Sequence, residues 1–128
     1  MTETISHGIV TDVSNPGPRL CIGRASMGYN IRIDHPGGRP IEPGESGHLY
    51  IHGVRGVSLF KDYYKNPDAN AAAFDADGWF DAGDIIRMDE AGNLFFSDRD
   101  KDMLRVGSEN VAASEIETVI METGWATE

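Results

Sequence analysis

Residues 85–96 read IIRMDEAGNLFF, a stretch in which two apolar runs flank a short polar turn. Ile85, Ile86 and Met88 come before the turn, and Leu94 begins the second run. A turn that contains Asp and Gly between two such runs favours a β-hairpin, because glycine supplies backbone angles that tight turns require. We therefore predict two strands here that pair directly.

Two further strands are predicted upstream of this hairpin. In residues 27–34, apolar side chains alternate with polar or small ones, at Tyr29, Ile31 and Ile33. This period of two favours a strand with one buried face. Residues 35–47 contain four glycines and three prolines, which predicts a loop with turns. Leu49 and Ile51 then alternate with polar and aromatic residues in the next strand.

Metal and thiol chemistry have little support in the sequence. His48 and His52 share a face of that predicted strand and could bind a metal, but no third ligand is recognisable nearby. Solvated or aromatic-packed histidines are the favoured interpretation. Cys21 is the only cysteine, which excludes an intrachain disulfide and favours a reducing compartment. Its only basic neighbours are Arg19 and Arg24, so a catalytic thiol is disfavoured.

Two helices are predicted. Asn66 and Pro67 indicate a helix start, with Asn as the N-cap and proline in the first turn. Alanines follow, and we expect this helix to end near Phe74. A capping box at Ser114 and Glu117 predicts a second helix that runs to about residue 124. Its apolar stripe is formed by Ile116, Val119 and Ile120.

Length and charge limit the possible functions. The chain has 128 residues and a net charge of −10, enough for about one small domain. The acidic balance removes the phosphate attraction that drives non-specific nucleic-acid binding. No apolar run reaches the roughly 18 to 20 residues that span a bilayer, and the first residues show no signal peptide. We therefore expect a cytoplasmic protein without a nucleic-acid partner or a membrane span.

Five short motifs follow one another in the second half of the sequence: GWFDAGD at 78–84, GNLFF at 92–96, DRDKDML at 98–104, GSENV at 107–111 and EIE at 115–117. Their order and spacing resemble those of the adenylate-forming superfamily of acyl-CoA synthetases, luciferases and peptide-synthetase adenylation domains. The GSENV motif is similar to that of CoA ligases of the fatty-acid, crotonobetaine or carnitine type. The resemblance implies a parent enzyme that activates a carboxylic acid with ATP and transfers the acyl group to CoA.

The resemblance also implies a nucleotide site. Asp84 matches the family aspartate that accepts hydrogen bonds from both ribose hydroxyls, which suits a carboxylate. Arg99 matches an arginine that reaches the ribose and phosphate region. Thr2 and Glu3 resemble a Thr-Glu motif whose threonine contacts phosphate and whose glutamate holds Mg²⁺. The implied cofactors are ATP or AMP, Mg²⁺ and CoA. A turn at Asp84, a surface ion pair at Arg99 and a flexible terminus are the alternatives.

Lys101 falls at the family's hinge position, about which the small C-terminal domain rotates between an adenylation pose and a thioester-forming pose. The resemblance therefore gives Lys101 a role in motion. Arg105, Ser108 and Glu109 fall in a segment that resembles the loop lining the pantetheine tunnel of CoA. Two residues depart from the family pattern. Ala82 replaces a Thr or Ser beside the ribose, and Ser108 replaces a nearly fixed glycine, which predicts strain if that position needs a positive φ.

The implied architecture is mainly β and α+β overall. Residues 1–98 correspond to the distorted β-barrel, with short helices, that closes the family's large domain. Residues 99–102 correspond to the hinge, and residues 103–128 to an incomplete small domain that begins with a β-hairpin and a helix. The charged run at 98–102 independently indicates a boundary. The family's phosphate-binding loop and catalytic lysine cannot be located in the sequence, so we expect no ligase turnover from the chain alone.

Two other interpretations stay open. One is a standalone, non-catalytic binding or interaction module that kept the barrel. The other is a truncated fragment whose bare apolar surfaces drive homo-oligomerisation, through the barrel's open face or the helix at 116–120. The acyl pocket is expected mostly upstream, and only Ser6, His7 and Gly8 could border it. For His7, a packing or surface role is favoured.

Overall fold

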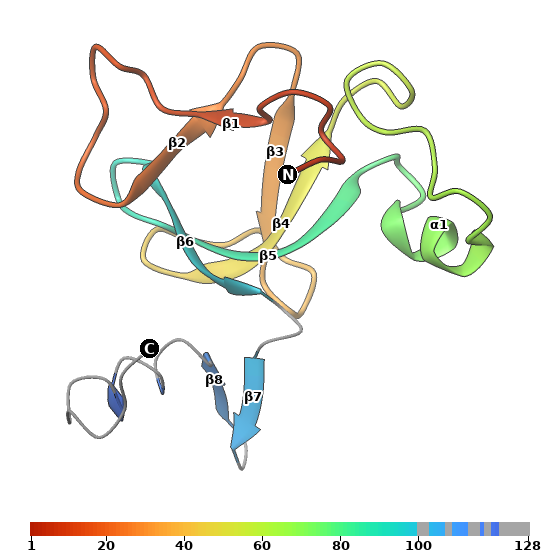
Figure 1. Ribbon diagram of the computed structural model, residues 1–128. Helices are drawn as coiled ribbons and strands as arrows, with labels where there is room; N and C mark the ends of the chain where they lie inside the picture. The colour runs from red at the N-terminus through yellow and green to blue at the C-terminus, as the bar shows by residue number, and fades with distance from the viewer. Residues whose placement is uncertain (100–102, 107–108, 113–115, 117–118, 121–128) are drawn as a thin grey trace.

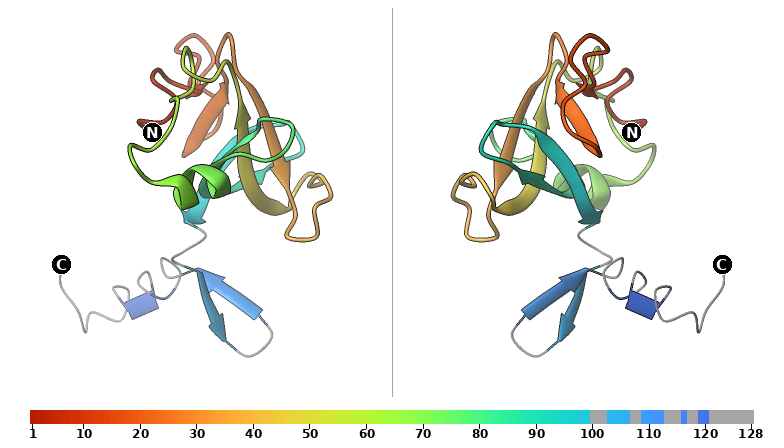
Figure 2. Two further views of the ribbon diagram at one scale, coloured as in Figure 1. Left: turned by 90° about the vertical axis from the view of Figure 1, so that its right-hand side faces the viewer. Right: turned by 90° about the vertical axis from the view of Figure 1, so that its left-hand side faces the viewer.

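The computed structural model describes residues 1–99, 103–106, 109–112, 116 and 119–120. Six strands form one antiparallel sheet in the order β1-β2-β6-β5-β4-β3 (Figure 1). Their bounds are β1 Ile9–Val10, β2 Cys21–Ala25, β3 Asn30–Asp34, β4 Ser46–His52, β5 Phe80–Met88 and β6 Leu94–Arg99. The sheet curls into a half-barrel, as the side views in Figure 2 show. The mainly β fold predicted from the sequence is therefore confirmed.

Strands β5 and β6 form the predicted hairpin. Met88 pairs with Leu94 across it. The Asp89 carboxylate closes the turn, because it accepts hydrogen bonds from the backbone N–H groups of Ala91 at 2.9 Å and Asn93 at 2.8 Å. β5 begins earlier than the apolar pattern indicates, at Phe80. Residue 84 consequently lies inside the strand and not in a turn before it.

Strands β3 and β4 confirm the two predicted upstream strands. Ile33 pairs with Leu49, and Ile31 pairs with Ile51. Leu49 and Ile51 are both buried. The loop between these strands is shorter than predicted, because β4 already begins at Ser46.

The predicted first helix is α1, Pro67–Ala73. The Asn66 side chain caps it by accepting a hydrogen bond from the Ala69 N–H at 3.2 Å. The helix ends where Phe74 adopts an extended backbone, as expected from the sequence. It contacts β5 and lies outside the curled sheet (Figure 1).

The core fills the inside of the half-barrel. Leu59 and Ile86 are its most deeply buried apolar side chains. Around Phe60, the rings of Tyr63, Phe74 and Phe80 lie with centroids 4.6 to 5.3 Å away. Aromatic contacts at this distance stabilise beyond simple burial. They attach the long connection between β4 and β5, including α1, to the sheet.

The N-terminal segment is tied to the same core. The buried Tyr29 hydroxyl lies within hydrogen-bonding reach of the carbonyl oxygens of Thr4 and Ser58. The Phe60 N–H also donates to the Glu3 carbonyl at 2.8 Å. Residues 1–8 are thereby held against the sheet, although they precede β1 and contain no regular element.

The second sheet has two strands, β7 Met103–Val106 and β8 Glu109–Ala112. They pair as an antiparallel hairpin, with Leu104 opposite Val111, at the place where the sequence predicts one. Of the predicted second helix, Ile116, Val119 and Ile120 are helical and exposed, and its other positions lie outside the described residues. No helix in the described part of the chain is long and apolar enough to cross a membrane.

Close packing of β3 against β4 predicts a strong effect of Gly47→Ala. A Cβ at Gly47 would lie 2.7 Å from Ile41 Cγ2 and closer still to the Asp34 carbonyl oxygen. Overpacking of this kind destabilises by about 1 to 3 kcal/mol. Urea unfolding should show that loss. The matched control is Gly37→Ala, whose Cβ would be 3.9 Å from the nearest atom; it should be neutral or stabilising by up to about 1 kcal/mol. Equal effects of the two substitutions would contradict this packing.

Candidate functional site

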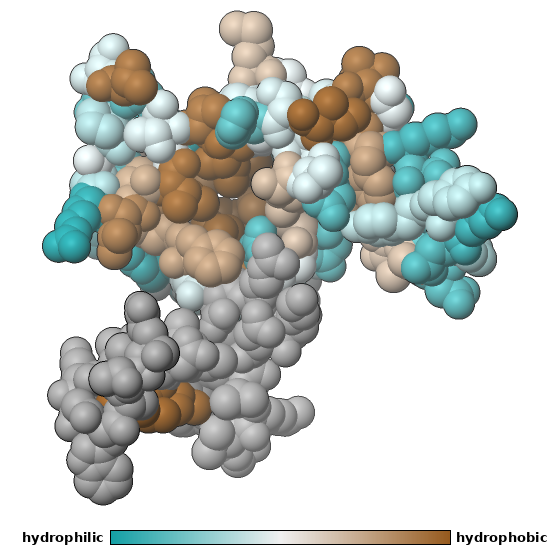
Figure 3. Space-filling model, in the orientation of Figure 1, coloured by the Kyte–Doolittle hydropathy of each residue, from teal (hydrophilic) through white to brown (hydrophobic). Residues whose placement is uncertain are grey.

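A cavity of about 460 Å³ opens on one face of the curled sheet. Its inner wall is apolar and comes from four strands, with Ile22, Leu49, Ile51, Ile86 and Phe96. The N-terminal segment, from Met1 through residues 4–9, borders its mouth. Figure 3 shows the hollow within the apolar surface. Among the described residues, Asp84 is the one acidic residue that lines it.

A β-bulge in β5 brings Asp84 to this cavity. His48 pairs with Ile85 and Tyr50 pairs with Asp81, so residues 82–84 of β5 lie opposite Leu49 alone. The bulge takes Asp84 out of the regular ladder with β4, as bulges near functional sites commonly do. Because the two extra residues preserve the alternation of faces, Phe80 and Ile86 on either side of the bulge both stay in the core.

Gly83 forms the corner of the bulge. Its backbone has φ 64°, a left-handed conformation that other residues adopt only with strain. Its N–H donates a hydrogen bond to Asp81 Oδ1 at 2.8 Å, which satisfies a donor that the ladder no longer uses. The Ala82 side chain packs half-buried against the core. The local sequence Asp-Ala-Gly-Asp thus supplies both the acceptor and the glycine that the bulge needs.

Asp84 and Arg99 are opposite each other on neighbouring strands. The register of β5 and β6 pairs their Cα positions, and opposite residues of an antiparallel pair are about 4.5 to 5.5 Å apart. A second register irregularity follows directly, between Ile85 and Ile86. The two residues that the sequence assigns to one ribose site therefore meet in the backbone, despite a separation of 15 positions in the chain.

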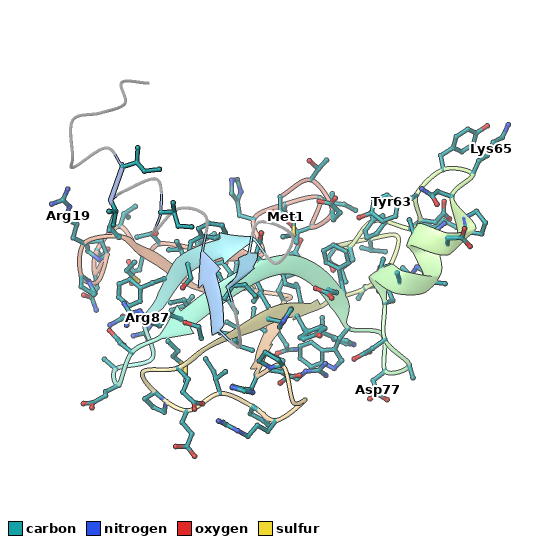
Figure 4. All side chains as sticks on the ribbon, turned by 90° about the horizontal axis from the view of Figure 1, so that it is seen from below. Met1, Arg19, Tyr63, Lys65, Asp77 and Arg87 are labelled. Atoms are coloured by element: carbon teal, nitrogen blue, oxygen red, sulfur yellow. The ribbon has the colours of Figure 1, made fainter. Side chains whose placement is uncertain are left out.

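Thr2 and Glu3 do not line the cavity. Thr2 is exposed and Glu3 is half-buried. The Tyr63 hydroxyl donates a hydrogen bond to Glu3 Oε1 at 3.3 Å. Burial and the negative charge of Glu3 raise the pKa of Tyr63, so this hydroxyl stays protonated at neutral pH. Figure 4 labels Met1 and Tyr63, and it shows the loop before α1 beside the N-terminal segment.

Thr4 lines the cavity, although sequence reasoning did not single it out. Its side chain is buried, and its hydroxyl donates one hydrogen bond within the turn, where the carbonyl oxygens of Ser6 at 2.5 Å and Met1 at 3.1 Å are both in reach. This hydrogen bond, with the one from Tyr29 to the Thr4 carbonyl, fixes the turn that carries the Thr-Glu pair. Thr4 is polar and the apolar Ile5 beside it is exposed, so the sequence around Thr4 contains no alternation that would predict its burial.

Glu3 is a single half-buried carboxylate. Mg²⁺ is usually bound through one or two carboxylates together with substrate phosphates, and Glu3 is of that ligand type. No group of three or more His, Cys, Asp or Glu in the described residues could hold a metal by itself. The His52 ring lies with its centroid 5.2 Å from that of Trp79, which confirms the aromatic-packed interpretation for this histidine.

The remaining predicted residues are spread over the cavity, the second sheet and positions outside the described residues. Ser6, His7 and Gly8 all line the cavity, and His7 is exposed. In the second sheet, the backbone pairs Arg105 with Asn110 and Glu109 with Val106. Lys101 and Ser108 lie outside the described residues. Cys21 is a half-buried free thiol.

An arginine clamp on the opposite face supports β5 and was not anticipated. Arg32 of β3 forms ion pairs with Asp34 at 2.7 Å and with Asp75 at 3.0 Å. Its guanidinium lies 4.7 Å from the ring centroids of both Tyr50 and Trp79, a favourable cation–π distance. The clamp therefore ties the turn that leads into β5 to the far edge of the sheet. In the sequence, Arg32 is only one polar residue of an alternating strand.

Several known proteins are similar to this chain in sequence or in fold. No family model matches the chain. Over 123 residues, 94% of the chain, it is 42% identical to crotonobetaine/carnitine–CoA ligases of Escherichia coli and Escherichia fergusonii. It is also similar to O-succinylbenzoate CoA synthetase (MenE) of Bacillus subtilis in complex with ATP and magnesium, with a TM-score of 0.80 and 29% identity over the whole chain. Apo MatB from Rhodopseudomonas palustris gives a TM-score of 0.72 and 29% identity over 91% of the chain.

Over nearly its whole length, the chain is thus similar to one segment of the adenylate-forming acyl-CoA synthetases. It spans 23% of the length of the Escherichia ligases, 26% of MenE and 22% of MatB. The adenylate-forming ligases therefore carry about three quarters of their length outside the segment that this chain matches.

The bulge predicts a graded response at position 83. A Cβ added there meets no atom within 4 Å, so only the backbone angle opposes substitution. Gly83→Asn should be nearly neutral, Gly83→Ala should destabilise by about 1 kcal/mol, and Gly83→Val by about 2 kcal/mol, because β-branched residues tolerate positive φ least. Chemical denaturation measures the series. If Val and Asn prove equally stable, the left-handed bulge is wrong.

Proposed function

We propose that this chain is the ribose-binding, hinge-bearing segment of an ATP-dependent acyl-CoA synthetase. In the first half-reaction, a carboxylate attacks the α-phosphate of ATP, giving an acyl-adenylate and pyrophosphate. In the second, the thiol of CoA takes the acyl group and AMP leaves. The observation that carries the proposal is Asp84, which lines the cavity and pairs in the backbone with Arg99. The complexes of the relative MenE with ATP and magnesium, with AMP and with an acyl-adenylate support it.

Asp84 suits the two neighbouring hydroxyls of a ribose. An ionised carboxylate is an acceptor with two oxygens, and hydrogen bonds to a charged acceptor contribute about 1.5 to 3 kcal/mol each. The bulge holds this residue in place before a ligand arrives, through Gly83 and the Asp81 carboxylate. A preorganised acceptor loses less entropy when it binds. Arg99, its backbone partner, is proposed to act on the ribose and phosphate region.

The N-terminal turn is proposed to serve the phosphates. Glu3 would hold Mg²⁺ together with phosphate oxygens, and Thr2 would contact a phosphate. Supporting this role, the turn is anchored by the buried Thr4 and by the Phe60 N–H. Magnesium supplies charge neutralisation at the phosphates when it is bound. The protein's own part is to hold the Glu3 carboxylate on this anchored turn, where the Tyr63 hydroxyl donates a hydrogen bond to it.

The hinge is proposed at residues 99–102, between a barrel part at 1–98 and the start of a small domain at 103–128. The end of β6 at Arg99 and the start of β7 at Met103 support this division. Lys101 would absorb the rotation, and Arg105, Ser108 and Glu109 would border the CoA thiol's path. Ser6, His7 and Gly8 at the cavity mouth would border the acyl group. The cytoplasmic location expected from the sequence stays a prediction.

Nucleotide binding tests the ribose role. AMP added to the isotopically labelled chain should shift the amide NMR signals of residues 82–86 and 99, whereas 2′,3′-dideoxy-AMP should not. Asp84→Asn should weaken AMP binding at least tenfold, about 1.4 kcal/mol, because the amide oxygen is a weaker acceptor. The matched control is Asp62→Asn on an exposed loop, which should bind like the wild type. Equal responses to the two nucleotides would contradict the assignment.

Catalysis should require more of the ligase than this chain. Incubated with ATP, Mg²⁺, CoA and a panel of carboxylic acids, the chain should release no AMP above the buffer rate, as measured by chromatography. The reason is that it spans about a quarter of its relatives, and no cation that would stabilise the adenylation transition state is recognisable in it. Acid-dependent AMP release would show that the chain is a complete catalyst. Ribose-specific binding without turnover separates the proposal from a module that has lost its nucleotide site.

A further inference from the structure

We infer that Tyr63 is a positioning residue for the Glu3 carboxylate, and that it controls how well this carboxylate serves a magnesium–nucleotide complex. The inference rests on the role proposed above for Glu3, and it adds a residue from the connection between β4 and β5. Tyr63 does not line the Asp84 cavity, so it would act through Glu3 and not by touching the nucleotide itself.

The contact with Glu3 is made by the tip of the Tyr63 side chain. The Tyr63 hydroxyl donates a hydrogen bond to Glu3 Oε1 at 3.3 Å, between residues 60 positions apart. Within the described residues, the other carboxylate oxygen, Oε2, makes no hydrogen bond or ion pair, so it is available to a ligand. Hydroxyl donors usually lie about 2.7 to 2.8 Å from their acceptors. The longer bond therefore orients the carboxylate while it neutralises little of its charge.

One short segment holds Glu3 at two points. The Phe60 N–H donates to the Glu3 carbonyl oxygen at 2.8 Å, while Tyr63 binds the side chain of the same residue. The ring centroids of Phe60 and Tyr63 lie 4.6 Å apart, so the two donors also pack on each other. Fixing a free glutamate side chain costs rotamer entropy. A carboxylate that is already oriented avoids part of that cost when a ligand binds.

Tyr63 is in turn held by helix α1. Asn70 Oδ1 accepts a hydrogen bond from the Tyr63 N–H at 2.5 Å, and Asn70 Nδ2 donates to the Tyr63 carbonyl oxygen at 2.9 Å. The Asn66 N–H donates to the same carbonyl at 3.2 Å. Tyr63 thus lies between α1 and the N-terminal segment (Figure 4). The next residue, Tyr64, is 83% exposed, so the helix fixes the one tyrosine of the pair that reaches Glu3.

Anchorage of the N-terminal turn does not require the Tyr63 hydroxyl. Thr4 is buried, and its carbonyl oxygen accepts a hydrogen bond from Tyr29. The Phe60 N–H holds the backbone of Glu3. The Tyr63 hydroxyl therefore adds the orientation of one carboxylate to a turn that is already fixed. Hydrogen-bond partners that orient a metal ligand are known to affect metal affinity.

The preference of the chain for ATP with magnesium tests the inference. The isotopically labelled chain is titrated with ATP in Mg²⁺ and in EDTA, and amide NMR shifts give the two dissociation constants, whose ratio is the preference. The wild type should bind ATP more tightly with Mg²⁺, and Glu3→Gln should remove this preference. Tyr63→Phe should lower it by about threefold to tenfold, at or below the lower limit for partners that orient a metal ligand, because the hydrogen bond is long. Tyr64→Phe is the matched control and should keep the wild-type preference.

Binding in EDTA separates positioning from folding. Tyr63→Phe retains the ring that packs on Phe60, so its Tm and its ATP affinity in EDTA should match the wild type. A merely structural role would weaken ATP binding equally with and without Mg²⁺, and an unchanged preference overturns the inference. If only Glu3→Gln loses the preference, the inference fails and the proposed role of Glu3 stands. If the wild type has no preference, or if Glu3→Gln keeps it, the role of Glu3 fails and the inference fails with it.

Discussion

The antiparallel pairing of β5 with β4 on one side and β6 on the other is the constraint on which the site depends. Pairing with β4 puts the buried Ile86 opposite Gly47 and so fixes which face of β5 belongs to the core. Pairing with β6 brings Arg99 opposite Asp84. The register irregularity on the β4 ladder includes residue 84, and the one on the β6 ladder follows it between Ile85 and Ile86. A regular strand would leave this acidic residue within an unbroken ladder, whereas the irregular one presents it beside a cavity.

The elements that the sequence predicted are those with local causes. The β5–β6 hairpin follows from Asp89, whose carboxylate forms the turn within five residues, and α1 follows from its cap at Asn66. The burial of Thr4 and the clamp of Arg32 depend on residues 25 and 43 positions away, Tyr29 and Asp75. No window of sequence contains both partners of such contacts. They became visible only when the sheet had brought the segments together.

The candidate site was predictable for a different reason. Asp84 and Arg99 carry no local signature of ribose binding, because Gly-Asp pairs and charged runs are common in turns and connections. Their assignment came from the order of motifs along the chain, and the register of β5 and β6 brings the two positions together independently. The Thr-Glu pair is less direct, since Glu3 contacts Tyr63 and only the next residue, Thr4, reaches the cavity. The family resemblance therefore drew attention to the N-terminal turn, but it did not identify Thr4 as the residue of that turn that is buried.

The cavity combines one carboxylate with apolar walls, and this combination decides how strongly Asp84 can bind a ribose. Asp84 beside an open mouth is partly hydrated, so its hydrogen bonds to a ribose compete with water. A nucleotide seated against the apolar wall would itself exclude water from the mouth, and the electrostatic part of those bonds grows as the local dielectric constant falls. The bulge at Gly83 is suited to this arrangement, because it keeps the carboxylate in place whether or not the mouth is covered.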